Sequence, residues 1–201
     1  AGLLRIAGVA EPDWTALPVQ GSGTYAIEAT LGTLIPREGR LLVAHNGAYG
    51  ERIVRLARAL HIAVQSIDVA EDAPLSADAI GRALDADPTI GFVAVVHCET
   101  STGQINPIPD IASAVHARGR RLIVDAMSSF GAVPLDLSLA SSPIDALITS
   151  ANKCLEGVPG FALVLCRRAL ITAASGQARG ISLDLSAQLA GLDRDGQFRF
   201  T

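Results

Sequence analysis

Aromatic residues and long hydrophobic runs are scarce in this sequence of 201 residues. Aromatics make up only 4% of it, so a folded core has to be built from aliphatic side chains. Apolar runs such as residues 92–96 are far shorter than a membrane span. Because no basic segment followed by an apolar stretch opens the sequence, we expect no signal peptide.

Cysteine and net positive charge are also lacking. The three cysteines, Cys98, Cys154 and Cys166, are an odd number without C-x-x-C spacing, which argues against a disulfide framework and a zinc ribbon. The net charge of −4 gives no electrostatic reason to bind nucleic acid. We therefore expect a cytoplasmic protein that takes no metal ion and has neither a membrane nor a nucleic-acid partner.

Short apolar segments rich in branched residues alternate along the chain with segments of helical spacing. Continuous apolar strands are typical of a parallel sheet covered on both faces, and the alternation indicates βαβ crossovers. The sequence predicts an α/β fold of three layers (α/β/α) around a mostly parallel central sheet. We expect strands at Arg40–His45, Ala63–Val69, Ile90–His97, Arg121–Asp125, Asp145–Ser150 and Phe161–Cys166, and helices at Tyr25–Leu34, Gly50–Leu60, Ser76–Leu84 and Pro109–Arg118.

Ligands of open α/β sheets bind beyond the carboxyl ends of the strands, so the segments after each strand were searched for chemistry. The segment Gly21-Ser22-Gly23-Thr24 precedes a helix, where backbone N–H groups and the helix dipole favour an anion. By itself this segment is better explained as a helix cap with glycines in the turn than as an anion site. It lacks the Gly-Lys-Ser/Thr sequence of a Walker A loop.

Two charged residues follow predicted strands. Asp125 ends the segment RLIVD, where its carboxylate either caps the next turn or pairs with a cationic ligand atom. Lys153 lies in the loop after DALITS and is the only lysine of the sequence, all other basic residues besides histidine being arginine. Unlike arginine, lysine can lose its proton and attack a carbonyl.

An anion cradle, a carboxylate at a strand end and a following lysine are together what pyridoxal phosphate requires. The cradle holds the phosphate, the carboxylate keeps the pyridine nitrogen protonated, and the lysine forms the Schiff base. Tyr49, in the segment Asn-Gly-Ala-Tyr-Gly, can supply a ring that stacks on the pyridine. Glu99 either caps a strand end or accepts a hydrogen bond from a neighbour of this site, and the sequence leaves both open.

Five segments resemble the class V branch of the fold-type I aminotransferases. Their order and spacing cover nearly the whole chain, and the last of them is the most specific. They are GSGTYAIEATLGTLIP (21–36), NGAYGER (46–52), HCETSTGQINPI (97–108), VDAMSSFGAVPLD (124–136) and SANKCLEGVPGF (150–161).

The resemblance implies residues that bind the phosphate of the cofactor. Ser22, Gly23 and Thr24 take this role, and Asn152 neighbours the phosphate. Thr201 is the candidate for a residue that reaches the phosphate of a partner subunit across a dimer interface.

The resemblance also implies residues around the ring of the cofactor. Lys153 is the Schiff-base lysine, and Asp125 pairs with the pyridine nitrogen. Tyr49 stacks on one ring face, Met127 packs on the opposite face, and Thr100 faces the side of the ring oxygen.

The family resemblance implies transamination of 2-aminoethylphosphonate with pyruvate by a homodimer whose active site lies at the subunit interface. Two alternatives stay open: an alanine– or serine–glyoxylate aminotransferase, and a non-catalytic α/β domain that binds a phosphate. Compared with the family, a segment is missing before Ala1 and a smaller domain after Thr201. We therefore expect residues 1–201 to form a pyridoxal-phosphate-binding large domain.

Overall fold

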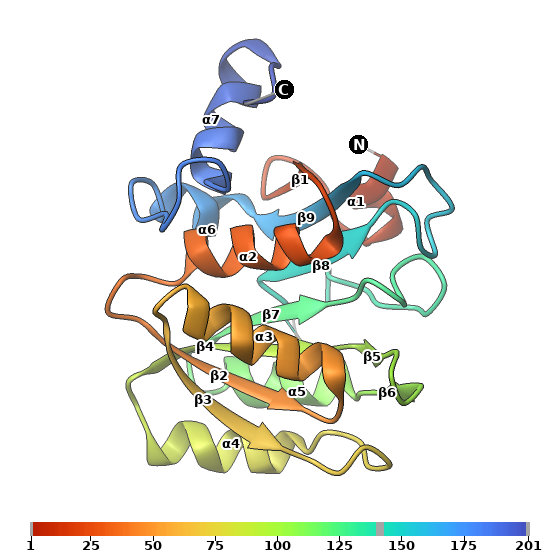
Figure 1. Cartoon of the computed structure of the whole chain (residues 1–201), viewed down its shortest axis with the longest axis vertical. Coiled ribbons are helices and arrows are strands. Elements are labelled where there is room, and N and C mark those ends of the chain that lie inside the picture. The colour runs from red at the N-terminus through yellow and green to blue at the C-terminus, as the bar shows by residue number, and fades with distance from the viewer. Residues whose placement is uncertain (1, 140–142, 200–201) are drawn as a thin grey trace.

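The chain forms an α/β fold around one seven-stranded sheet (Figure 1). The computed structural model describes residues 2–139 and 143–199. The order of the strands across the sheet is β1-β9-β8-β7-β4-β2-β3. The strands of this sheet are β1 (Trp14–Gln20), β2 (Arg40–His45), β3 (Ala63–Asp68), β4 (Ile90–Val96), β7 (Arg121–Asp125), β8 (Ala146–Ser150) and β9 (Phe161–Arg167), and a separate hairpin pairs β5 (Cys98–Glu99) with β6 (Gln104–Ile105).

The sheet is mostly parallel, which confirms the predicted fold class. The pairs β8–β7, β7–β4, β4–β2 and β2–β3 are parallel, whereas β9 runs antiparallel to both β8 and β1. The sequence did not predict β1, which contains Pro18. Proline lacks a backbone donor and is confined to edge strands, and β1 lies at the edge of the sheet.

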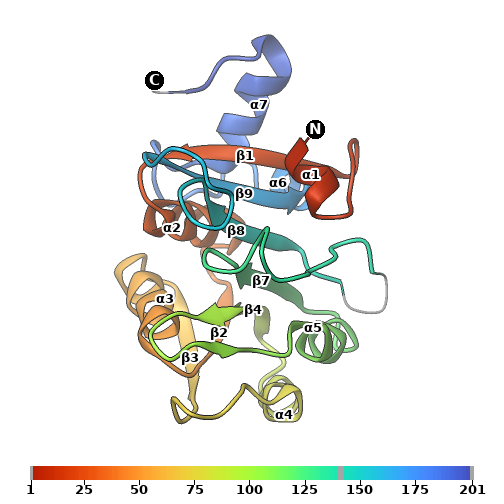
Figure 2. The same ribbon diagram turned by 90° about the vertical axis from the view of Figure 1, so that its right-hand side faces the viewer.

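Helices cover both faces of the sheet (Figure 2). Helices α2 and α3 lie on one face, and α4 and α5 lie on the other, while α7 stands at the β1 end of the molecule (Figures 1 and 2). The helices are α1 (Gly2–Ile6), α2 (Gly23–Leu34), α3 (Ala48–Ala59), α4 (Ala77–Ala86), α5 (Ile108–His116), α6 (Arg168–Ala173) and α7 (Leu185–Asp195). The sequence did not predict α1, α6 or α7.

Each face of the sheet carries its own aliphatic core. Alternate residues of one strand belong to different cores, since Leu41 lies in the core under α2 and α3, while Leu42 lies in the core under α4 and α5. Strands buried on both faces account for the continuous apolar runs in the sequence. Helix α4 begins at a side-chain cap, because Ser76 Oγ accepts a hydrogen bond from the Ala79 N–H at 3.2 Å.

The parallel strands β4, β7 and β8 end on the same side of the sheet, next to the start of α2. The segments that follow these strands carry most of the predicted site residues. Within the part of the chain that the structure describes, no helix has both the length and the apolarity that crossing a membrane requires.

Candidate active site

A narrow cavity of about 40 Å³ opens where β4 and β7 end. Its walls come from α2, α3, the ends of β4 and β7, and the loop after β8, so the topology brings five distant segments together. The lining residues are Thr24, Ile27, Tyr49, Arg52, Val96, Cys98, Thr100, Asp125, Met127, Ser128 and Lys153. Six of the residues predicted from the sequence are among them, namely Thr24, Tyr49, Thr100, Asp125, Met127 and Lys153.

Asp125 is a buried carboxylate, only 3% exposed, at the last position of β7. Burial raises its pKa to about 6, although a hydrogen bond from the Met127 N–H to Oδ1, 3.0 Å long, opposes this shift. The charge of Glu99 raises the pKa further, and the charges of Arg52 and Lys153 lower it. Among the described residues no salt bridge to Asp125 is found, so its negative charge faces the cavity without a cationic partner.

The N-cap residue of α2 does not use its hydroxyl to cap the helix. Ser22 is the N-cap, but its side chain makes no cap hydrogen bond. Gly21 has a φ of +108°, a conformation that favours glycine, and its N–H donates to the Gly160 carbonyl at 2.8 Å. A Cβ on Gly23 would overlap Met127 Sδ, so any larger residue at this position would displace the Met127 side chain.

The loop after β8 presents Lys153 to the cavity. The Gly157 N–H donates to the Ala151 carbonyl at 2.7 Å, and the Glu156 N–H donates to the Lys153 carbonyl at 2.9 Å, which folds the loop into consecutive turns. Lys153 and its neighbour Asn152 are both exposed. Lys153 lines the same cavity as Asp125, whereas Asn152 does not.

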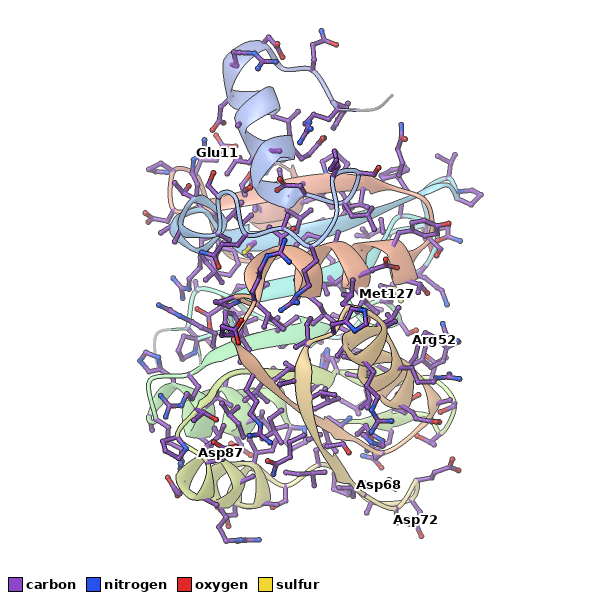
Figure 3. All side chains as sticks on the ribbon, turned by 60° about the vertical axis from the view of Figure 1, so that its left-hand side comes forward. Glu11, Arg52, Asp68, Asp72, Asp87 and Met127 are labelled. Atoms are coloured by element: carbon purple, nitrogen blue, oxygen red, sulfur yellow. The ribbon has the colours of Figure 1, made fainter. Side chains whose placement is uncertain are left out.

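Tyr49 and Met127 provide the apolar surfaces of the site. Both side chains are half-buried and pack against the core under α2 and α3. The Arg52 guanidinium lies 4.8 Å from the centroid of the Tyr49 ring, a cation–π distance. Met127 lies beside the ends of α2 and α3, and Arg52 projects from α3 (Figure 3).

Thr100 and Ser128 close another side of the cavity. Their hydroxyl oxygens lie 2.6 Å apart, and Cys154 Sγ donates to the Ser128 carbonyl at 3.3 Å. Ser128 joins the turn after β7 to the hairpin that carries Thr100 and to the lysine loop. These links tie three of the segments around the cavity to one another.

Sequence reasoning missed Arg52 and Ser128 and left the role of Glu99 open. Arg52 follows Tyr49 by three positions, so helical spacing alone places both on one helix face. Ser128 is followed by a second serine, and nothing in the sequence separates the two. Thr201, the candidate for a contact with a partner subunit, lies outside the described residues.

His97 is buried directly after the end of β4, outside the lining of the cavity. Its Nδ1 lies 2.9 Å from Ser129 Oγ, and burial lowers its pKa. In the described part of the chain, no group of three His, Cys, Asp or Glu side chains could hold a metal ion.

A family model, aminotransferase class V, matches residues 16–186, which include every described segment around the cavity. The chain belongs to the class V aminotransferases. It is 54% identical over its 201 residues to a 2-aminoethylphosphonate–pyruvate transaminase of Burkholderia thailandensis, and 53% identical to a protein of the same name from Burkholderia pseudomallei. The chain spans 54% of the length of each of these relatives.

Solved structures of aminotransferases share the fold. The pyridoxamine–pyruvate aminotransferase of Mesorhizobium loti matches 99% of this chain and 50% of its own, with a TM-score of 0.87 and 26% identity. An aspartate aminotransferase from Thermus thermophilus matches all of this chain and 55% of its own, with a TM-score of 0.84 and 26% identity.

Class V aminotransferases use pyridoxal phosphate, and the chemistry of the cavity fits this cofactor. The buried Asp125 suits a cationic ring nitrogen, and the unused N-cap hydroxyl of Ser22 suits a phosphate.

Proposed function

We propose that this chain is the cofactor-binding large domain of an aminotransferase that moves the amino group of 2-aminoethylphosphonate to pyruvate. One observation carries the reaction type: the only lysine of the chain lines the same cavity as a buried aspartate for which the described residues provide no salt bridge. The names of relatives more than 50% identical to the chain support the two substrates.

The start of α2 would hold the phosphate of the cofactor. The hydroxyls of Ser22 and Thr24 and the backbone of Gly23 would donate hydrogen bonds there, assisted by the positive end of the helix dipole. Asn152 would lie on the same side, next to the lysine. In a homodimer Thr201 would add a hydroxyl from the partner subunit.

The middle of the cavity would hold the ring. The Asp125 carboxylate would accept a hydrogen bond from the protonated ring nitrogen, whose positive charge would pair with it. Tyr49 and Met127 would cover the two ring faces, and the Thr100 hydroxyl would face the ring oxygen. When bound, pyridoxal phosphate supplies a carbonyl carbon that takes up an amine and a ring that withdraws electrons.

Lys153 would perform the proton transfer. Its Nζ, as a free amine, would take a proton from the substrate carbon and return it to a carbon of the cofactor. With Asp125 holding the opposite charge at the ring nitrogen, the electrons left behind would be drawn away from the substrate carbon. Pyruvate would take up the amino group in the reverse sequence and leave as alanine.

Covalent trapping tests the cofactor assignment. The chain is mixed with pyridoxal phosphate, reduced with borohydride, digested and mapped by mass spectrometry. We expect a visible absorption band before reduction and the pyridoxyl group on the peptide that contains Lys153. Lys153→Arg is the matched control, because it keeps the charge but cannot attack the carbonyl. Label on Lys153→Arg, or on another residue of the wild-type chain, contradicts the proposal.

A chimera tests the substrates. The matching 201 residues of the Burkholderia thailandensis relative are replaced by this chain, and the visible absorption band reports that the chimera holds cofactor. We expect 2-aminoethylphosphonate to bleach the band and pyruvate to restore it with release of alanine. Restoration by glyoxylate in place of pyruvate would favour a glyoxylate aminotransferase, and an unchanged band would contradict transamination.

We further propose a cytoplasmic homodimer in which residues 1–201 form one domain. The three cysteines, all free, support a reducing compartment. The assignment of Thr201 to a partner subunit requires the dimer. Sedimentation of the chimera checks it, and a monomer would contradict it.

A further inference from the structure

Helix α3 begins without a cap of its own. Its N-cap residue is Gly47, which has no side chain to accept hydrogen bonds from the first turn. The first three N–H groups of the helix are instead satisfied by the segment after β4. The Ala48 N–H donates to Ser101 Oγ at 3.1 Å, the Tyr49 N–H to Glu99 Oε1 at 3.2 Å, and the Gly50 N–H to Glu99 Oε2 at 3.0 Å.

Glu99 is the centre of this arrangement. The residue is 0% exposed, and the Ser101 hydroxyl donates to its Oε1 at 2.7 Å. A Cβ on Gly47 would collide with the side chains of Glu99 and Ser101, so the absence of a local cap makes room for the remote one. No salt bridge to Glu99 occurs within residues 2–139 and 143–199, so the N-terminal dipole of α3 stabilises the carboxylate.

Glu99 is linked through the backbone to two residues that line the cavity, Tyr49 and Thr100. Tyr49 lies in the helical turn whose N–H groups Glu99 accepts. Thr100 lies between Glu99 and Ser101, and its hydroxyl reaches Ser128 at 2.6 Å. One buried side chain therefore sets the position of two lining residues that come from segments far apart in the sequence.

We propose that Glu99 is a positioning residue that fixes Tyr49 and Thr100 relative to each other, so that both contact the ring of the cofactor in one orientation. The inference rests on the proposed function, because it concerns the residues that face pyridoxal phosphate. Glu99 touches no reacting atom and acts through the backbone of α3 and the hairpin turn.

The test is Glu99→Gln, which keeps the shape of the side chain but turns one acceptor into a donor facing N–H groups. Two properties are measured besides activity: the dissociation constant of pyridoxal phosphate, by absorbance titration, and the visible circular dichroism of the bound cofactor. We expect the dissociation constant to rise about tenfold and the dichroism to fall, because the ring loses its fixed surroundings. Glu99→Asp, which restores the charge, is expected to recover part of both.

Asp184→Asn is the matched control. Asp184 caps α7, where its Oδ1 accepts from the N–H groups of Ser186 and Ala187 and from the Ser186 hydroxyl, but it does not line the cavity. We expect this variant to lower the unfolding temperature and to leave cofactor affinity and dichroism unchanged. Equal cofactor effects in the two variants would reduce Glu99 to a structural role and overturn the proposal.

Ser101→Ala provides a milder second variant if Glu99→Gln does not fold. It removes one donor to Glu99 and one acceptor for α3, and we expect a smaller loss of dichroism in the same direction. Wild-type affinity and dichroism in every variant that folds would overturn the inference while leaving the proposed function intact. Failure of the wild-type chain to be trapped at Lys153 would instead overturn the proposed function, and the inference with it.

Discussion

Two buried aspartates lie on neighbouring strands of the sheet, at opposite ends. Asp145 precedes β8 at the end remote from the cavity and is 5% exposed. It has a full set of partners: Arg121 Nη1 at 3.0 Å, Arg167 Nε at 3.9 Å and the Leu122 N–H at 2.9 Å. Asp125, as deeply buried, accepts a single hydrogen bond within the described residues, from the Met127 N–H.

The difference separates a carboxylate that the fold surrounds with partners from one that faces a cavity. An ionised buried carboxylate is destabilising unless cations or several donors surround it. At Asp145 the fold supplies them, and at Asp125 it does not, so the raised pKa of Asp125 reflects an interaction that the protein alone leaves incomplete.

The largest expected effect concerns the pH dependence of stability without cofactor. The pKa of Asp125 in the folded chain, about 6, lies above the ordinary value of 3.8, so the folded state binds this proton more tightly than the unfolded state. The stability that the proton contributes is present at low pH and is lost as pH rises from about 4 to about 6. Relative to wild type, Asp125→Asn is expected to gain about 3 kcal/mol of unfolding free energy across that window.

Urea unfolding at several pH values between 4 and 7, followed by far-ultraviolet circular dichroism, measures this difference. Comparing the variant with wild type cancels the contributions of the other carboxylates. A difference that does not change with pH would mean that burial does not raise the pKa of Asp125.

The next effect is a loss of stability at the other end of the sheet. Asp145→Asn removes the charge that faces two arginines and weakens the hydrogen bond from Leu122. We expect the free energy of unfolding at pH 7 to fall by about 2 kcal/mol. Asp85→Asn, which breaks the exposed pair with Arg118, is the control and is expected to lose less. Equal losses would show that burial adds nothing to the Asp145 network.

The smallest effect tests whether the partners of Asp145 act together. Arg121 is half-exposed, and Arg121→Gln leaves Arg167 and the Leu122 N–H in place. We expect a loss of about 0.5 kcal/mol in the same urea experiment. A loss as large as that of Asp145→Asn would mean that this one arginine carries the network.

The sequence separates the two aspartates by their place on the predicted strands. Asp125 ends RLIVD and Asp145 begins DALITS, and ligands of open α/β sheets bind beyond the carboxyl ends of the strands. The rarity of lysine likewise draws attention to Lys153. The arginines that surround Asp145 could not be predicted, because Arg121 and Arg167 come from two other strands. The remote cap of α3 had no local signal, because Glu99 lies far along the chain from the helix that it serves.

The fold could be predicted where hydrophobic periodicity is strong. The apolar runs of β2, β4, β7, β8 and β9 were all recognised as strands, and their alternation with helices gave the fold class. The reversed direction of β9 could not be predicted, since periodicity carries no information on direction. Strand β1 was missed because Pro18 and flanking polar residues interrupt its pattern.

The hydrogen bond from the Gly21 N–H to the Gly160 carbonyl has a consequence for how the protein is made. It joins the turn before α2 to the start of β9, and β1 pairs with β9 along its whole length. During synthesis β1 emerges early, yet its only partner strand in the described sheet emerges after almost all the others. Contacts between such distant residues form slowly, so the side of the cavity at the start of α2 is expected to be among the last parts of the molecule to fold on the ribosome.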